Sequence, residues 1–139
     1  IRAYEIKSYT KKSMTSWFKN TKSDYDKTDF FKICIDFPRK DLIERINQRS
    51  KEMIESGAIL EVKKFIKLRV PKEKSLSKAI GISEIKEYLQ KKIQTEQLIE
   101  KISIKTRQYA KRQSTWARGN MKDWIKVNPD GLNKILKKI

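Results

Sequence analysis

The segment Phe30–Phe37, which reads FFKICIDF, limits the folds open to this chain more than any other segment. It alternates and is rich in β-formers, which predicts a strand over about residues 31–37 that ends at Pro38. A second, shorter strand is predicted over Asp123–Val127, about 123–127. Two isolated strands do not make a stable sheet, and FFKICIDF is apolar enough for a strand with neighbours on both sides in a parallel sheet. We therefore expect the neighbouring strands to precede Ile1.

Helices are predicted for most of the remaining chain, because apolar residues recur there at three- and four-residue spacing. The first expected helices are the end of one over Arg2–Tyr9, one from about Asp41 closed by Gly57, and Ile59–Leu68 with Ile59, Val62, Phe65 and Ile66 inward. The later ones are one opening at Ile80–Glu84 with Ser83 as N-cap, one from Thr95 to about Arg112 or slightly beyond with a break at Gly119-Asn120, and Leu132–Ile139 after a turn at Pro129–Gly131. Thr10–Asp29 predicts a connection with a short helical turn, in which Trp17 and Phe18 form an isolated anchor. The expected fold class is α/β, predominantly helical, in one unit over residues 1–139.

The formal net charge of +17 indicates either a polyanionic partner or a compositional bias of the source, and both remain open. The chain has no histidine, which removes the usual neutral-pH base and most zinc sites. Its single cysteine, Cys34, fits a reducing cytoplasm and a buried place in the first strand. No apolar run approaches the ~20 residues that span a bilayer, so no membrane partner is expected.

The segment Thr106–Arg118, TRQYAKRQSTWAR, covers the last part of the long predicted helix and the residues after it. Tyr109 and Ala110 lie on the apolar face of that helix. Cations flank this face on both sides, and Trp116 adds a stacking surface between them. Basic residues interleaved with an aromatic ring suit single-stranded or looped RNA. The alternative is a solvated amphipathic helix with a tryptophan in the core, and composition favours neither.

Three arginines lie at or after the end of the first predicted strand, where ligands of α/β sheets bind: Arg39, Arg45 and Arg49. A guanidinium can donate two parallel hydrogen bonds to a diphosphate, while ion pairing with Glu44 or Glu52 is the alternative role. The aspartates Asp24, Asp26, Asp29, Asp36 and Asp41 form no close pair, and no complete catalytic constellation or P-loop motif is present.

Several motifs occur in an order that resembles one family. They are RAYEI at Arg2–Ile6, DLIERINQR at Asp41–Arg49, Met53, Gly57, Glu61-Val62, Ala79-Ile80-Gly81 with Glu84, Tyr88-Leu89, TRQYAKRQ at Thr106–Gln113, and Thr115-Trp116. Over roughly Arg2 to Trp124 the chain resembles the C-terminal half of bacterial tRNA dimethylallyltransferases, the adenosine-37 isopentenyltransferases.

The resemblance implies a P-loop NTPase-like parallel-sheet core, of which this chain would be the C-terminal portion. The N-terminal P-loop portion, the general-base aspartate and an inserted tRNA-gripping domain would precede Ile1. The implied reaction moves a dimethylallyl group from its diphosphate to N6 of adenosine 37 of tRNA, a base that leaves its stack. The implied partners are tRNA and dimethylallyl diphosphate. The implied cofactor is Mg²⁺ with ligands outside this chain, and the full-length enzyme would be a cytoplasmic monomer.

The resemblance also assigns site residues. Arg49 matches the arginine that stabilises charge on the leaving diphosphate. The tRNA-contacting positions are Arg2, Lys78, Ala79, Ile80, Gly81, Ile82, Ser83, Lys111, Arg112, Gln113, Ser114, Thr115, Trp116, Ala117 and Arg118. Ile82, Ser83 and Ala117 depart from the family's usual residues. Without a P-loop and a base we expect this chain to be inactive alone. The alternative function is a non-catalytic RNA-binding module. A DNA-binding domain is a weaker alternative, because the sequence has no recognisable helix-turn-helix pairing.

Overall fold

The computed structural model describes residues 1–137, apart from the side chain of Lys27, and the described chain forms two compact units. The first unit is Ile1–Lys32, and the second begins at Ile33. Residues 138–139, where the final helix is predicted to end, lie outside the described residues.

The first unit consists of short helices: α1 (Arg2–Thr10), α2 (Met14–Asn20) and a 3₁₀-helix, η1 (Lys27–Asp29). The predicted helix over Arg2–Tyr9 is confirmed. The hydroxyl of Ser13 caps α2 by accepting a hydrogen bond of 3.1 Å from the amide of Ser16.

The aromatic side chains of this unit are mostly outside any core. Trp17 is 46% and Phe18 69% exposed, so neither is buried within this unit, and their role as an anchor stays a prediction. The Trp17 indole donates a hydrogen bond of 3.2 Å to the Thr10 hydroxyl, which holds the ring against α1 rather than in an apolar cluster. Among the described side chains of residues 1–32 none is buried.

The second unit begins its helical part with α3 (Arg39–Glu55) and α4 (Ala58–Lys67). The buried residues of α3 are Ile46, Ser50 and Ile54, which follow the four-residue spacing of one helix face. Gly57 adopts φ +109° between the two helices, so its predicted place after the first helix is confirmed. The predicted inward positions of Ile59, Val62 and Phe65 are confirmed, because Val62 is buried and the other two pack against the core. Ile66 was also expected inward but is 40% exposed.

A 3₁₀-helix, η2 (Ser75–Lys78), leads into α5 (Ile82–Leu89). The N-cap of α5 is Gly81 and not Ser83, which corrects the prediction. The reason is a capping box in which the Glu84 carboxylate reaches back and accepts the Gly81 N–H at 2.9 Å. Ser83 therefore lies inside the first turn of the helix.

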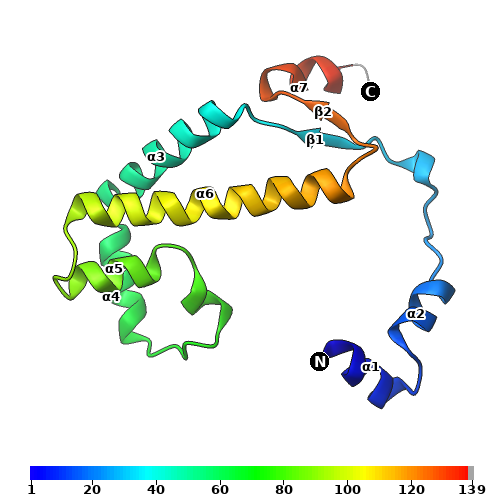
Figure 1. Cartoon of the computed structure of the whole chain (residues 1–139), viewed down its shortest axis with the longest axis horizontal. Helices are drawn as coiled ribbons and strands as arrows, with labels where there is room; N and C mark the ends of the chain where they lie inside the picture. Colours follow the sequence, from blue (N-terminus) through cyan, green and yellow to red (C-terminus); the bar gives the residue numbers. More distant parts are fainter. Residues whose placement is uncertain (138–139) are drawn as a thin grey trace. The chain divides into compact units, whose positions relative to one another are not determined.

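The longest helix is α6 (Thr95–Asn120). It continues two turns beyond the predicted end near Arg112, because residues 113–118 contain neither proline nor glycine. The predicted break at Gly119-Asn120 coincides with its last turn. Figure 1 shows α3 alongside α6, with α4 and α5 near the N-terminal end of α6.

The core lies among α3, α4, α5 and α6. Its buried members are Ile54, Val62, Ile82, Ile85, Leu98 and Ile102. Ile85 and Leu98 are the most completely buried, with 1% and 0% exposed. In this way α5 and α6 are fixed against each other by apolar contact over their N-terminal turns.

The strands β1 (Ile33–Ile35) and β2 (Ile125–Val127) pair in parallel, with Ile33 opposite Ile125. Both lie where strands are predicted and the mainly helical α/β class is confirmed, but each strand is three residues long. The strands are short because a strand extends only as far as its backbone has a hydrogen-bonded neighbour. Here the pairing ends with the bond of 2.9 Å from the Asp36 amide to the Val127 carbonyl. Cys34 is half-buried in β1.

The last helix, α7 (Pro129–Leu136), begins at the residues predicted as a turn. Pro129 occupies the first helical position, where its missing N–H costs nothing. The Asn128 side chain accepts a hydrogen bond of 3.4 Å from the Asp130 amide, so Asn128 is the N-cap. The turn prediction at Pro129–Gly131 is therefore wrong.

Candidate nucleic-acid interface

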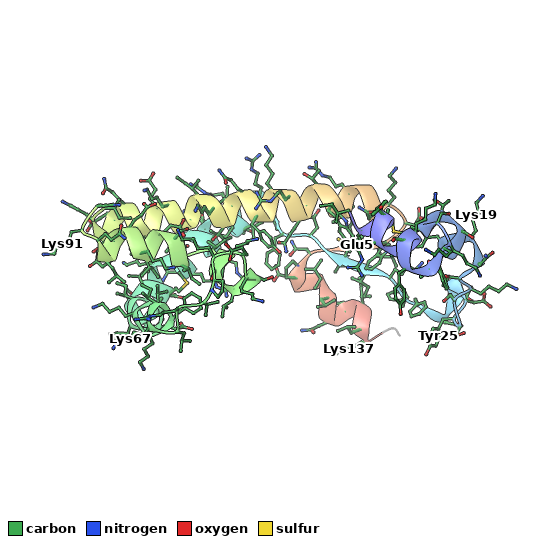
Figure 2. All side chains as sticks on the ribbon, turned by 90° about the horizontal axis from the view of Figure 1, so that it is seen from below. Glu5, Lys19, Tyr25, Lys67, Lys91 and Lys137 are labelled. Carbon is green, nitrogen blue, oxygen red and sulfur yellow. The ribbon has the colours of Figure 1, made fainter. Side chains whose placement is uncertain are left out.

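The C-terminal part of α6 carries basic side chains and no acidic ones, and Lys101 and Lys105 pair with carboxylates of α5. Between Glu100 and Asp123 the sequence contains seven lysines and arginines and no carboxylate: Lys101, Lys105, Arg107, Lys111, Arg112, Arg118 and Lys122. Side chains that end in nitrogen project from the yellow-to-orange ribbon of α6 in Figure 2. Such a run attracts the phosphates of a nucleic acid and releases their counterions on contact.

The predicted contact segment Lys111–Arg118 is helical throughout. Trp116 is 58% exposed, which leaves its ring available for stacking and rules out a fully buried tryptophan. Tyr109, predicted on the apolar face, is 49% exposed, and the Arg112 guanidinium lies 5.6 Å from its ring centroid. The Arg118 guanidinium donates to the Thr115 hydroxyl at 3.4 Å, so the polar side chains of this segment are mutually ordered.

A groove of about 610 Å³ runs between β1 and the end of α6. Its lining is Ile33, Cys34, Ile35, Arg112, Gln113, Trp116, Ala117 and Met121. The structure thus brings four residues of the predicted contact segment beside β1, together with Met121, which was not predicted. Ala117 is half-buried here, which suits its small side chain.

The other predicted contact segment of this unit, Lys78–Ser83, is the bend between η2 and α5. Gly81 has φ +103°, and a Cβ at this position would lie 3.6 Å from Cε of Met53. Ile82 is 8% exposed and belongs to the core, whereas Ile80 is 38% exposed. The segment therefore exposes the side chains of Lys78, Ala79, Ile80 and Ser83 to solvent, and the side chain of Ile82 is buried.

A buried carboxylate lies beneath this bend. Glu84 is 2% exposed and accepts hydrogen bonds from the Gly81 amide at 2.9 Å and the Ser83 hydroxyl at 2.9 Å, together with an ion pair from Lys105 of α6. Burial raises the pKa of the Glu84 carboxyl, but the bonds from Lys105, its own backbone amide, Ser83 and Gly81 together hold that pKa below its ordinary value. The carboxylate is therefore charged at neutral pH.

This cluster was not predicted, although one signal for it exists in the sequence. Gly81-x-x-Glu84 has the spacing of a capping box, which indicates a glutamate that turns back to the start of the helix. Its partner, Lys105, is too distant in the sequence for any spacing rule to pair the two.

Arg49 lies on α3 with an exposed side chain. Among the described residues no carboxylate lies within 4.0 Å of its guanidinium, so the alternative of an ion pair with Glu44 or Glu52 is not observed. Glu52 instead accepts a hydrogen bond of 2.7 Å from Gln48. The Arg45 guanidinium lies 4.9 Å from the centre of the Phe37 ring, whereas Arg49 has no such aromatic partner in the part of the chain that the structure describes.

The remaining predicted position, Arg2, is exposed in the first turn of α1 in the other unit. Among the described residues there is no group of three His, Cys, Asp or Glu side chains that would hold a metal ion. No helix of the described part is both long and apolar enough to cross a bilayer.

The order of these elements matches a known family. The family model described as IPP transferase matches residues 1–120. The chain belongs to the IPP transferase family. The matched residues include α1, the bend at Gly81 and all of α6, and therefore every predicted site residue of this chain.

Curated relatives within the IPP transferase family carry the name tRNA dimethylallyltransferase. The protein from Pelagibacter ubique is 53% identical over 139 residues, which is 100% of this chain and 44% of the relative. The protein from Ehrlichia canis is 39% identical over 117 residues, which is 84% of this chain and 39% of the relative. The chain thus spans less than half the length of these relatives.

Two solved structures are similar in fold. The tRNA delta(2)-isopentenylpyrophosphate transferase from Staphylococcus epidermidis gives a TM-score of 0.68 at 29% identity, covering 99% of this chain and 48% of that protein. The full-length tRNA isopentenylpyrophosphate transferase from Bacillus halodurans gives 0.64 at 32% identity, covering 82% of this chain and 36% of that protein.

Proposed function

We propose that this chain is the tRNA-facing part of a tRNA dimethylallyltransferase. The observation that carries the proposal is the acid-free basic surface of α6, with its exposed Trp116, in a member of the IPP transferase family. Cations and a stacking ring on one helix suit a looped single-stranded segment such as an anticodon loop. The contact residues are the predicted ones: Arg2, the bend Lys78–Ser83 and the segment Lys111–Arg118.

In the proposed reaction, N6 of adenosine 37 bonds to the dimethylallyl carbon while the bond from that carbon to the diphosphate oxygen breaks. Negative charge gathers on the departing diphosphate. Arg49 is proposed to donate hydrogen bonds to it, a role open to a guanidinium without a carboxylate partner. The proton lost by N6 and the Mg²⁺ ion that the resemblance implies are assigned to residues outside these 139.

A hybrid protein tests this function. In it, the present chain replaces the matching 139 residues of the Pelagibacter ubique relative, to which it aligns over its whole length. The hybrid should transfer a labelled dimethylallyl group from its diphosphate to an unmodified tRNA transcript. The 139-residue chain alone should bind that tRNA without transferring the group.

Two results would contradict the proposal. The first is a hybrid that folds and binds tRNA but transfers nothing, which would favour the alternative of a non-catalytic RNA-binding module. The second is a chain that binds duplex DNA of equal length as tightly as tRNA, since a looped RNA contact depends on unstacked bases.

A further inference from the structure

The buried carboxylate of Glu84 joins the predicted contact segment Lys78–Ser83 to α6, the helix that also carries the other predicted contact segment. It accepts the Gly81 amide and the Ser83 hydroxyl at the start of α5, and it pairs with Lys105 on α6. The Lys105 ammonium also donates to the Ser83 hydroxyl at 3.3 Å, which closes the network. No described buried side-chain nitrogen or oxygen lacks a partner, so the network is fully satisfied.

This network lies at a bend that backbone hydrogen bonds also hold, among them the bond of 2.9 Å from the Ile85 amide to the Gly81 carbonyl. Gly81 has φ +103°. Glycine adopts positive and negative φ values about equally readily, so its own conformational preference does not hold it there. On the core side, Met53 and Ile102 lie 3.6 and 4.0 Å from where a Cβ would be. The Gly81 N–H has the buried Glu84 carboxylate as its partner, so Glu84 is the side chain that holds the peptide between Ile80 and Gly81.

Joining α5 to α6 does not require a buried charge. Glu87 on α5 already pairs with Lys101 on α6 at 2.6 Å, with both side chains nearly half exposed. The apolar core also holds the two helices together. A charge that is buried costs free energy unless it is well paired, so the place of Glu84 calls for a reason beyond helix packing.

We propose that Glu84 is a positioning residue for RNA binding. It holds the backbone of Lys78–Ser83 in fixed register with the basic surface of α6, so that both segments meet one RNA at once. The inference rests on the proposed function, because it names what aligns the two contact segments. Glu84 itself is buried and touches no RNA.

The charge of Glu84 makes the inference testable by the sign of an effect. Glu84→Gln removes a negative charge and releases Lys105, which by electrostatics alone should tighten RNA binding. If Glu84 positions the bend, the same substitution should weaken binding instead. Glu87→Gln is the matched control, since it makes the same charge change on the same helix and also releases a lysine of α6.

The experiment measures the dissociation constant of the 139-residue chain for an unmodified tRNA transcript at two salt concentrations. We expect Glu84→Gln to bind about tenfold more weakly than the original chain, the effect of losing a hydrogen-bonded charge. Glu87→Gln should bind as tightly or more tightly. Amide exchange at Gly81 should be faster in Glu84→Gln and unchanged in Glu87→Gln.

A second pair of variants serves if Glu84→Gln does not fold. Lys105→Gln and Lys101→Gln each remove one positive charge from α6, and Lys105→Gln should weaken binding more because it also disturbs the bend. Binding of Glu84→Gln as tight as that of Glu87→Gln, or equal losses in the two lysine variants, would overturn the inference alone. An original chain that does not bind tRNA would overturn the proposed function and this inference with it.

Discussion

At the scale of single residues, Arg49 separates binding of RNA from transfer of the prenyl group. In the hybrid protein, Arg49→Ala should lower kcat by about 10²–10³-fold, as when one donor to a developing negative charge is removed. Affinity for tRNA should change little, because the arginine is proposed to act on the diphosphate. Single-turnover transfer and equilibrium binding of tRNA measure the two quantities separately.

Arg45→Ala is the control for Arg49. It removes the same side chain from the same helix, but the Arg45 guanidinium lies over the Phe37 ring and should contribute less to transfer. Equal losses of turnover and of tRNA affinity in Arg49→Ala would count against a role at the leaving group.

Residue roles were predictable where they depend on the local sequence. Gly57 was predicted at its position because a helix that ends and a second that begins need a positive φ between them. The buried ion pair of Glu84 was not predicted, since its partner Lys105 comes from another helix. Ile82 was placed in a contact segment by resemblance, and its burial depends on the packing of α4, α5 and α6.

At the scale of elements, the two glycines at helix ends should respond in opposite directions to alanine. Gly57→Ala forces φ +109° on a residue with a Cβ, which should lower the free energy of unfolding by about 1–2 kcal/mol. Gly119 lies within α6, and an added Cβ there would have nothing within 4 Å. Gly119→Ala should therefore raise the free energy of unfolding by about 0.5–1 kcal/mol. Urea unfolding followed by circular dichroism measures both, and shifts of the same sign would contradict the assigned backbone conformations.

Element boundaries were harder to predict than element types. The apolar spacing of α3 and α4 was sufficient to place both helices within about two residues. The beginning of α7 was missed, because Pro-Asp-Gly is also a turn sequence and the Asn128 cap that decides between them depends on the preceding strand. The strands are short because hydrogen-bonded partners, and not β-forming residues, set their length.

At the scale of the whole molecule, the net charge of +17 should act on RNA through α6 rather than evenly. The double substitution Lys111→Ala with Arg112→Ala should weaken tRNA binding and reduce the slope of log K against log salt by about 1.4. Filter binding over a range of salt concentrations measures the slope.

The control for that prediction is Lys63→Ala with Lys64→Ala, which removes two exposed positive charges from α4. It should leave the slope nearly unchanged. Equal reductions in both double variants would mean that RNA senses the total charge, and that compositional bias explains the basic character of the chain.

The parallel pairing of β1 with β2 also sets an order of events during synthesis. The chain makes β1 before α3, and β2 only after α6, so Ile33–Ile35 are made four helices earlier than the strand β2 with which they pair. The helices depend on contacts that are close in sequence, whereas this pairing joins distant parts of the chain and forms slowly. β1 also lines the groove at the end of α6, so in a nascent chain stopped before Ile125 one wall of that groove would lack its pairing with β2.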